Sequence, residues 1–280
     1  MKRRNFLLAT CALTVASTTK IATGAENSDK IKKAVKYHMV TGKRSVQEKF
    51  QLVKDLGFDG IETRVALGEK NRALVDSYLD ASQKTGLPIH GVIHSSNPTL
   101  KEAVDQAAYL GAHSVLHVVP YNQKIGYFEN YQNTQQTIRA ATSQAEAKQV
   151  MILLENVWAT FLIDPVAMAK YIDEINSPMV GAYFDVGNVV RWGWPPHWIE
   201  VLGSRIKKLD IKEYDLKIAM NEGMRNGFQP PLGSGSVDWK KVREELARIK
   251  YEGWATAEVK GGDRARLEEI ATQMNDVLQI

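Results

Sequence analysis

The feature that most constrains the fold of this chain is a regular alternation of short apolar β-type runs with longer stretches of helical periodicity, beginning near residue 31. Such alternation is typical of βα units, which build a parallel sheet covered by helices. We count eight runs, at residues 34–40, 59–62, 89–94, 114–119, 150–155, 180–185, 206–211 and 254–259. Eight βα units in a chain of 280 residues predict an α/β protein with one closed (β/α)8 barrel, the TIM barrel.

The stretches between these runs have the spacing of amphipathic helices. Val46, Phe50, Val53 and Leu56 recur at helical intervals before Gly57, and glycine is favoured where a helix ends. One segment departs from a minimal βα repeat: residues 214–239, which are rich in proline and glycine. We expect a long loop there, on the side of the barrel that carries active sites; a mobile insertion is the alternative.

The first 25 residues have the composition of an export signal. A basic start is followed by an apolar run too short to span a membrane and then by small residues ending at Ala25. The adjacent Arg3 and Arg4, followed by Phe6 and Leu7, are typical of a twin-arginine signal, although a plain secretory signal is an alternative. We therefore expect residues 1–25 to be removed, residues 26–280 to form one TIM-barrel domain, and the mature protein to be periplasmic or extracellular.

Charge and cysteine content exclude several classes of function. Without residues 1–25, the chain has 32 Lys and Arg against 32 Asp and Glu. A formally neutral protein gives no argument for nucleic acid or an anionic membrane as a partner of the mature form. Cys11, the single cysteine, lies in the predicted signal, so the mature protein has no disulfide, thiolate nucleophile or sulfur ligand for zinc.

Four consecutive predicted strands, the fifth to the eighth, each carry one carboxylate at the C-terminal end. These residues are Glu155, Asp185, Asp210 and Glu258. In barrels of this kind such positions face a shared mouth. Carboxylates beside apolar strands are costly unless they are paired or bind a cation, and hard oxygen ligands suit Mg²⁺ or Mn²⁺. We expect one divalent metal ion; isolated salt bridges at strand ends are the alternative.

Five stretches resemble the sugar isomerases and epimerases with a xylose-isomerase-like TIM barrel, a family that includes tagatose 3-epimerase, hydroxypyruvate isomerase and inosose dehydratase. The stretches are residues 56–62, 184–188, 205–212, 232–239 and 251–258. The resemblance covers nearly the whole mature chain. It implies the same barrel and an enzyme that acts on a small sugar.

The resemblance also implies roles for single residues. The family holds its metal with Glu, Asp, His and Glu from the fifth to the eighth strand, which correspond here to Glu155, Asp185, Asp210 and Glu258. Asp210 departs from this pattern, because the family has histidine there. By resemblance, Glu155 and Glu258 are also the catalytic residues that exchange a proton with the carbon next to the carbonyl, and the metal polarises the substrate oxygens.

Further polar residues near strand ends are candidates for substrate contact. These are Glu62, His94, His117, Asn188 and Lys212. His117 has an alternative interpretation as a hydrogen-bonded core histidine, whereas we favour a functional role for Lys212 because a cation offsets the charge of so many acids. Four tryptophans near the ends of the fifth and sixth strands either stack on a sugar or pack: Trp158, Trp192, Trp194 and Trp198.

These observations favour an isomerase or epimerase that acts on a small keto-sugar. Four carboxylates around a divalent ion keep a formal charge of about −2, which disfavours a phosphate nearby, so we expect an unphosphorylated substrate. A lyase or dehydratase acting on an inosose or 3-keto-glycoside is the first alternative, and a non-catalytic sugar-binding barrel is the second. The sequence does not fix the sugar or the metal, and it leaves a homo-oligomer open.

Overall fold

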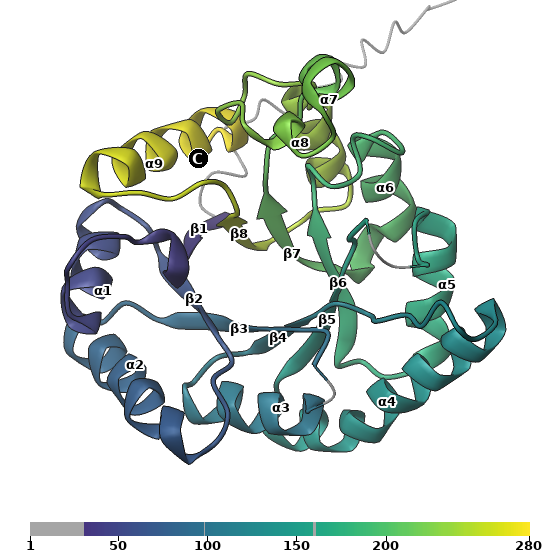
Figure 1. Cartoon of the computed structure of the whole chain (residues 1–280), viewed down its shortest axis with the longest axis horizontal. Helices are drawn as coiled ribbons and strands as arrows, with labels where there is room; N and C mark the ends of the chain where they lie inside the picture. Colours follow the sequence, from purple (N-terminus) through teal and green to yellow (C-terminus); the bar gives the residue numbers. More distant parts are fainter. Residues whose placement is uncertain (1–30, 98, 159–160) are drawn as a thin grey trace, which may run out of the picture.

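The structure is a computed structural model that describes residues 31–97, 99–158 and 161–280. The predicted export signal lies outside the described residues. Eight parallel strands pair in chain order, and the barrel closes where β8 pairs with β1. The predicted (β/α)8 barrel is therefore confirmed, and Figure 1 shows the helices surrounding the strands.

Strands and helices alternate along the chain, with one additional helix between β7 and α8. The strands are β1 (Ile31–Lys36), β2 (Gly60–Arg64), β3 (Ile89–Ser95), β4 (Ser114–His117), β5 (Met151–Glu155), β6 (Val180–Asp185), β7 (Ile206–Ile211) and β8 (Gly253–Ala257). The helices are α1 (Val46–Asp55), α2 (Arg72–Thr85), α3 (Leu100–Tyr109), α4 (Tyr127–Lys148), α5 (Pro165–Ile175), α6 (Pro195–Leu202), α7 (Leu216–Glu222), α8 (Trp239–Arg248) and α9 (Arg264–Leu278).

Side-chain caps determine where several helices begin. At α1, the Ser45 hydroxyl accepts the Glu48 N–H and the Glu48 carboxylate accepts the Ser45 N–H, which is a capping box. Aspartates accept hydrogen bonds from backbone N–H groups at the starts of α5, α7, α8 and α9.

Among the described residues, no helix combines the length and apolar character needed to cross a membrane.

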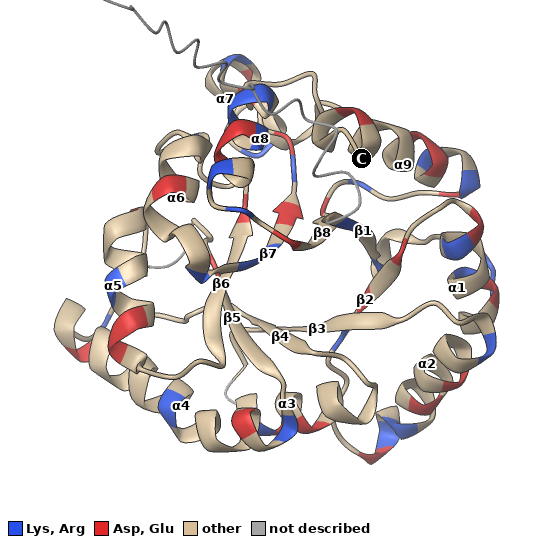
Figure 2. Ribbon diagram, turned by 180° about the vertical axis from the view of Figure 1, so that it is seen from behind, with Lys and Arg blue, Asp and Glu red and all other residues tan. Residues whose placement is uncertain are grey.

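The strands separate two apolar regions, because their side chains alternate between the outer and inner faces of the barrel. Outward residues of β3, β4 and β5 belong to the main core beneath the helices, whereas inward Ile93, Leu116, Leu153 and Tyr183 form a small cluster of their own. Charged residues lie chiefly on the outer helices and loops, with some on strands such as β2 and β7 (Figure 2). Because only inward side chains reach the interior of the barrel, the residues at the inward strand positions determine the chemistry of its mouth.

The predicted bounds of the first and last strands need correction. The first strand was expected at residues 34–40, but β1 spans Ile31–Lys36, and Tyr37–Met39 form a 3-10 helix. Ala34 and Val35 pair with both neighbouring strands, whereas Lys36 pairs with β2 alone, opposite Glu62. The last strand ends at Ala257 instead of residue 259, although the Glu258 N–H still donates to the Ile211 carbonyl at 3.0 Å.

The predicted long loop at residues 214–239 is also more ordered than expected, because it contains α7 and a 3-10 helix at Asn226–Phe228. The buried Glu213 carboxylate fixes the end of this segment. It accepts hydrogen bonds from the N–H groups of Gly233 (2.8 Å) and Val237 (3.2 Å) and from Nε1 of Trp239 (2.9 Å). Proline and glycine content predicted an irregular chain, but it could not reveal an internal carboxylate that organises it.

Candidate active site

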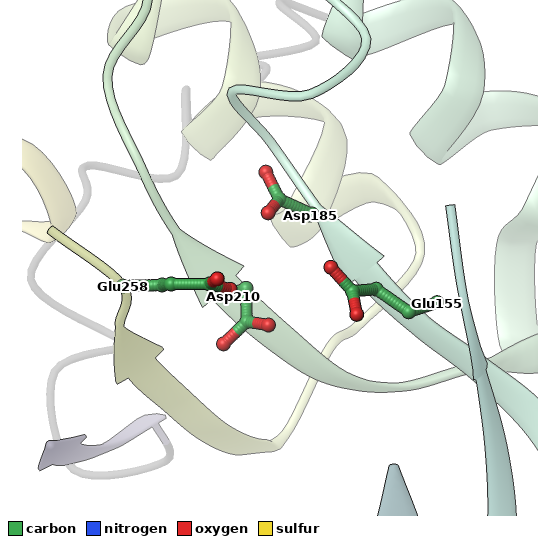
Figure 3. A group of neighbouring side chains, drawn as sticks. All are labelled: Glu155, Asp185, Asp210 and Glu258. Atoms are coloured by element: carbon green, nitrogen blue, oxygen red, sulfur yellow. The ribbon is translucent and has the colours of Figure 1, made fainter. Parts of the chain in front are cut away.

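Four carboxylates converge at the C-terminal ends of β5 to β8. One oxygen of each of Glu155, Asp185, Asp210 and Glu258 lies within 4.8 Å of those of the others. We call these four residues the carboxylate ring, and Figure 3 shows their side chains pointing toward one another. Asp185 and Asp210 are fully buried, whereas Glu155 and Glu258 are partly exposed. Glu258, whose side chain is 31% exposed, is therefore the ring member that solvent reaches most readily.

Two lysines offset part of the negative charge of the ring. Nζ of Lys36, the last residue of β1, donates to Oδ2 of Asp210 at 2.9 Å and to Oε2 of Glu258 at 2.6 Å. Nζ of Lys212, just after β7, lies 2.7 Å from Oδ2 of Asp185 and 3.4 Å from Oε1 of Glu258. Each ammonium therefore bridges two carboxylates, and Glu258 takes part in both bridges.

Two asparagines hold the β5 and β6 side of the ring. The Asn156 side chain bonds both backbone groups of Asp185 at 2.8 Å, which ties the end of β5 to the end of β6. The Asn188 N–H donates to Oδ1 of Asp185 at 2.8 Å, and its Nδ2 lies 3.4 Å from Oε1 of Glu155. Oδ1 of Asn188 accepts a bond from Nζ of Lys212 at 3.2 Å. Asn188 and Lys212, both predicted substrate contacts, thus adjoin the ring.

The surroundings of the ring separate the pKa values of its members. Burial and the nearby Glu258 raise the pKa of Glu155 to about 8. Burial also raises the pKa of Asp185 and that of Asp210, against the opposing effect of Lys212 and Lys36 respectively. At Glu258, burial raises the pKa, but Lys36 and Lys212 outweigh it and hold the pKa well below the ordinary value. Glu258 is therefore the ring member that is most strongly held as an anion.

The donor set fits a divalent metal ion. Mg²⁺ binds oxygens at about 2.1 Å, so opposite ligands lie about 4 Å apart, close to the spread of the ring oxygens. Oδ1 of Asp210 is buried and has no hydrogen-bond partner among the described residues, so it is free to bind a cation. Carboxylates are the oxygen ligands that Mg²⁺ and Mn²⁺ favour. The roles of Glu155, Asp185, Asp210 and Glu258 as ligands stay a prediction.

Glu62, a predicted substrate contact, lies inside the barrel and is fully buried. A Cβ atom on Gly91 would lie within 3.0 Å of the Glu62 carboxylate, the Ser114 hydroxyl and Nζ of Lys208, so these three groups crowd the space that the glycine leaves. Nζ of Lys208 also bonds Nδ1 and the carbonyl of His90, each at 2.7 Å. Glu62 thus belongs to a buried polar layer that sequence reasoning did not anticipate.

His94 and His117 lie on the outer face of the barrel, which corrects their expected position at the mouth. Alternation along β3 and β4 turns them away from inward Ile93 and Leu116. Their Nδ1 atoms are 3.4 Å apart, and Nε2 of His94 lies 3.3 Å from the hydroxyl of Thr99, the residue before α3. We therefore place the pair in the wall between β3, β4 and α3. The core interpretation of His117 agrees with this position.

Aromatic residues line one side of the ring. Nε1 of Trp158 donates to the Asn188 carbonyl at 2.6 Å, and its ring lies 6.2 Å from that of Trp192 and 5.1 Å from that of Phe228. Nζ of Lys212 lies 5.3 Å from the centre of the Phe228 ring. Trp192 is exposed, whereas Trp198 is buried in the core. Trp192 is thus a surface residue, and Trp198 is a packing residue of the core.

The most important residue that sequence reasoning missed is Lys36. The first strand was expected to continue to residue 40, so Lys36 was assigned to its interior and not to its end. Its signal was a lysine two residues after Ala34, in the same phase of the strand alternation. Asn156 gave a weaker signal, because a polar residue after a strand-end carboxylate is common in loops.

Comparison with known proteins places the chain among enzymes of sugar metabolism. A family model described as xylose isomerase-like TIM barrel matches residues 50–278. A protein assigned as an L-ribulose-5-phosphate 3-epimerase in Escherichia coli (strain K12) is 23% identical over 74% of this chain and 80% of its own length. A 2-epi-5-epi-valiolone 7-phosphate 2-epimerase from Actinoplanes sp. is 29% identical over 55% of this chain and 52% of its own length.

Solved structures share the fold. The crystal structure of 3-keto-D-glucoside 4-epimerase from E. coli superposes with a TM-score of 0.72, covering 90% of this chain and 100% of that one at 13% identity. At that level of identity the likeness concerns the barrel alone.

Proposed function

Because this chain belongs to the family of xylose isomerase-like TIM barrels, we propose that it is a divalent-metal-dependent isomerase or epimerase of a keto-sugar. The observation that supports this activity best is the carboxylate ring, in which Glu155 and Glu258 reach the same space from β5 and β8. Both sequence relatives described above are named as epimerases. An ion bound to the ring, Mn²⁺ or Mg²⁺, would polarise the substrate carbonyl and a neighbouring hydroxyl oxygen.

Glu155 and Glu258 are suited to opposite halves of a proton transfer. In the metal-free site, two lysines hold Glu258 as an anion, whereas burial and the neighbouring Glu258 raise the pKa of Glu155. Two carboxyl groups whose pKa values are pushed apart are the usual basis for a base and an acid in one site. Glu258 takes the proton from the carbon next to the carbonyl, the C–H electron pair enters an enediolate, and Glu155 returns a proton to that carbon.

The charge of the site favours an unphosphorylated substrate. With a divalent ion bound, four ionised carboxylates and two ammonium groups sum to a formal charge of zero, so the ring offers no net positive charge to a phosphate. The sequence relatives carry phosphate in the names of their substrates, so this point separates our proposal from them. We further propose that residues 1–25 direct export; an exported enzyme favours an unphosphorylated substrate, because phosphorylated sugars are chiefly intracellular metabolites.

Deuterium exchange tests the proposed reaction directly. The protein is loaded with Mn²⁺ and incubated in D₂O with free ketoses, their phosphates and 3-keto-glycosides, and products are followed by NMR and mass spectrometry. We expect deuterium at the carbon next to the carbonyl, together with a new epimer or isomer, for an unphosphorylated substrate. Glu155→Gln and Glu258→Gln should each lower turnover by about 10³-fold, and exposed Glu222→Gln should not change it.

The alternatives give different products. A lyase or dehydratase would eliminate water or the glycosidic group and produce an enone with its own ultraviolet absorbance. A sugar-binding barrel without activity would bind ligand but exchange no deuterium. Either result would contradict the proposed isomerase.

A further inference from the structure

Lys36 occupies an unusual position for a cation in a metal site. Its side chain is only 3% exposed and points into the barrel from β1. Nζ makes two hydrogen bonds shorter than 3.0 Å, to oxygens of Asp210 and Glu258. These oxygens belong to two of the four residues that would bind the ion. The ammonium group therefore holds ligand atoms of the ring from the inside.

An ammonium group and a divalent ion cannot share these oxygens at full strength. The ammonium has three N–H donors and no lone pair, so it cannot become a ligand, and its charge repels the ion at short range. Lys212 is less restrictive, because it is 13% exposed and makes only one short contact, to Asp185. Lys36 has no comparable access to solvent. It must remain in the barrel when an ion enters.

We propose that Lys36 is a tethered cation that competes with the divalent ion for Asp210 and Glu258. The inference rests on the metal-dependent function proposed above. Without metal, Lys36 compensates the buried carboxylates, so the barrel closes with its ring in place. With metal, the ion binds the same two carboxylates and weakens their contacts with Lys36. The metal affinity of this chain is therefore lower than four carboxylates alone would give.

The competition between Lys36 and the ion is tested by titrating metal-free protein with Mn²⁺ in a calorimeter, which measures the Mn²⁺ affinity. We expect Lys36→Met to bind Mn²⁺ at least about tenfold more tightly than the wild type, because a repulsive charge is removed at short range. Lys36→Gln, which keeps N–H donors without the charge, should do the same. It also serves as the second variant if Lys36→Met does not fold. Equal or weaker Mn²⁺ binding by the folded variants would overturn the inference.

Lys33→Met is a matched control. Lys33 is on the same strand and similarly buried, but its Nζ faces α9, where it lies 2.7 Å from Oδ1 of Asn275 and 3.4 Å from the Ala271 carbonyl. Its Mn²⁺ affinity should stay within about twofold of the wild type, because screening weakens the interaction of distant charges. If Lys33→Met also binds Mn²⁺ tenfold more tightly, the effect belongs to net charge and not to the position of Lys36.

Thermal unfolding separates competition from a merely structural role. Metal-free Lys36→Met should unfold at a lower temperature than the wild type, because it leaves buried carboxylates without a counter-ion. Saturating Mn²⁺ should raise its midpoint more than that of the wild type, since tighter binding stabilises more. A lowered midpoint with no larger metal response would contradict the inference.

The same titrations distinguish failure of this inference from failure of the proposed function. If the wild type binds Mn²⁺ and is active but Lys36→Met binds no more tightly, the competition is wrong and the enzyme stands. If the wild type is active without any divalent ion and Lys36→Met alone binds Mn²⁺, the competition stands and the proposed metal dependence is wrong.

Discussion

The two halves of the barrel present different chemistry at their inward strand ends. The β5–β8 half supplies the whole carboxylate ring. The β1–β4 half supplies Lys36, a deeper Glu62, and the apolar Ile93 and Leu116. One half therefore carries acid groups that require a cation, and the other carries one cation and a largely apolar wall. The difference shows that the two halves meet electrostatically where β1 pairs with β8, because Lys36 binds acids at the ends of β7 and β8.

The largest expected difference in turnover and metal affinity is between a substitution in the β5–β8 half and one in the β1–β4 half. Asp185→Asn removes a buried anion, and we expect turnover to fall by about 10³-fold or more, since a bound metal supplies several kcal/mol of catalysis. Its Mn²⁺ affinity, measured by calorimetry, should fall by about 100-fold or more, because even outer-shell changes cost 10–100-fold. His94→Asn, in the outer wall of the other half, should alter both by less than about tenfold. Equal losses in the two variants would break the comparison.

A second variant separates two kinds of carboxylate within the β5–β8 half. Glu213 accepts hydrogen bonds from several donors after β7 and contacts no member of the ring in the described hydrogen bonds. Glu213→Ala should lower the free energy of unfolding by about 3–5 kcal/mol, because the buried N–H groups that now donate to the carboxylate would lose their acceptor. Chemical denaturation measures this loss. Glu222→Ala, an exposed position in α7, should change it by less than about 0.5 kcal/mol, and a similar loss there would contradict the role of Glu213.

The histidine pair should influence stability in acid and not metal binding. Burial and the neighbouring His94 lower the pKa of His117 from 6.5 to about 4. The folded state then binds fewer protons than the unfolded state, so this contribution to stability is complete above pH 6.5 and is lost as the pH falls to about 4. The loss amounts to about 3 kcal/mol. His117→Asn should show a smaller decline in the free energy of unfolding over this range, measured by denaturation at several pH values.

An unchanged acid dependence in His117→Asn would mean that other groups are responsible for the decline. His94 must be considered with it, because burial lowers the pKa of His94 too and the two rings share a contact. Calorimetric Mn²⁺ affinity of His117→Asn at pH 7 serves as the control, and it should equal that of the wild type.

The smallest expected effect concerns the periphery of the β1–β4 half. Ser45→Ala removes the side-chain acceptor of the capping box of α1 and should destabilise the protein by about 1 kcal/mol, measured by thermal unfolding. Ser77→Ala, at a partly exposed position of α2, should change stability by less than about 0.5 kcal/mol. A measurable change in metal affinity in either variant would show that the halves are coupled beyond the ring.

Periodicity was sufficient to predict the barrel, and strand-end positions were sufficient to predict which acids meet. The alternation of apolar runs determines the number of strands, and closure of a parallel barrel brings Glu155 and Glu258 together. Register and strand ends were harder, because they depend on pairing between distant segments. A strand that ends at Lys36 and not at residue 40 moves a lysine from an assumed wall into the site.

The buried polar layer could not be predicted for a related reason. Lys208 and Glu62 are ordinary charged residues in sequence, and only the space above Gly91 reveals that they approach each other inside the barrel. His94 and His117 show the opposite error. Histidines near strand ends resemble site residues, but the phase of alternation in β3 and β4 turns them outward.

The bond between Lys36 and Glu258 joins residues that are 222 positions apart in the chain. Because β8 must pair with β1 before these groups meet, the site is completed only by the last closure of the barrel. Contacts of such sequence separation form late, since a long loop must first be closed. A chain still emerging from the ribosome therefore contains Lys36 but lacks Glu258, the fourth acid, and a folding intermediate without β8 has no complete pocket with which to capture an ion.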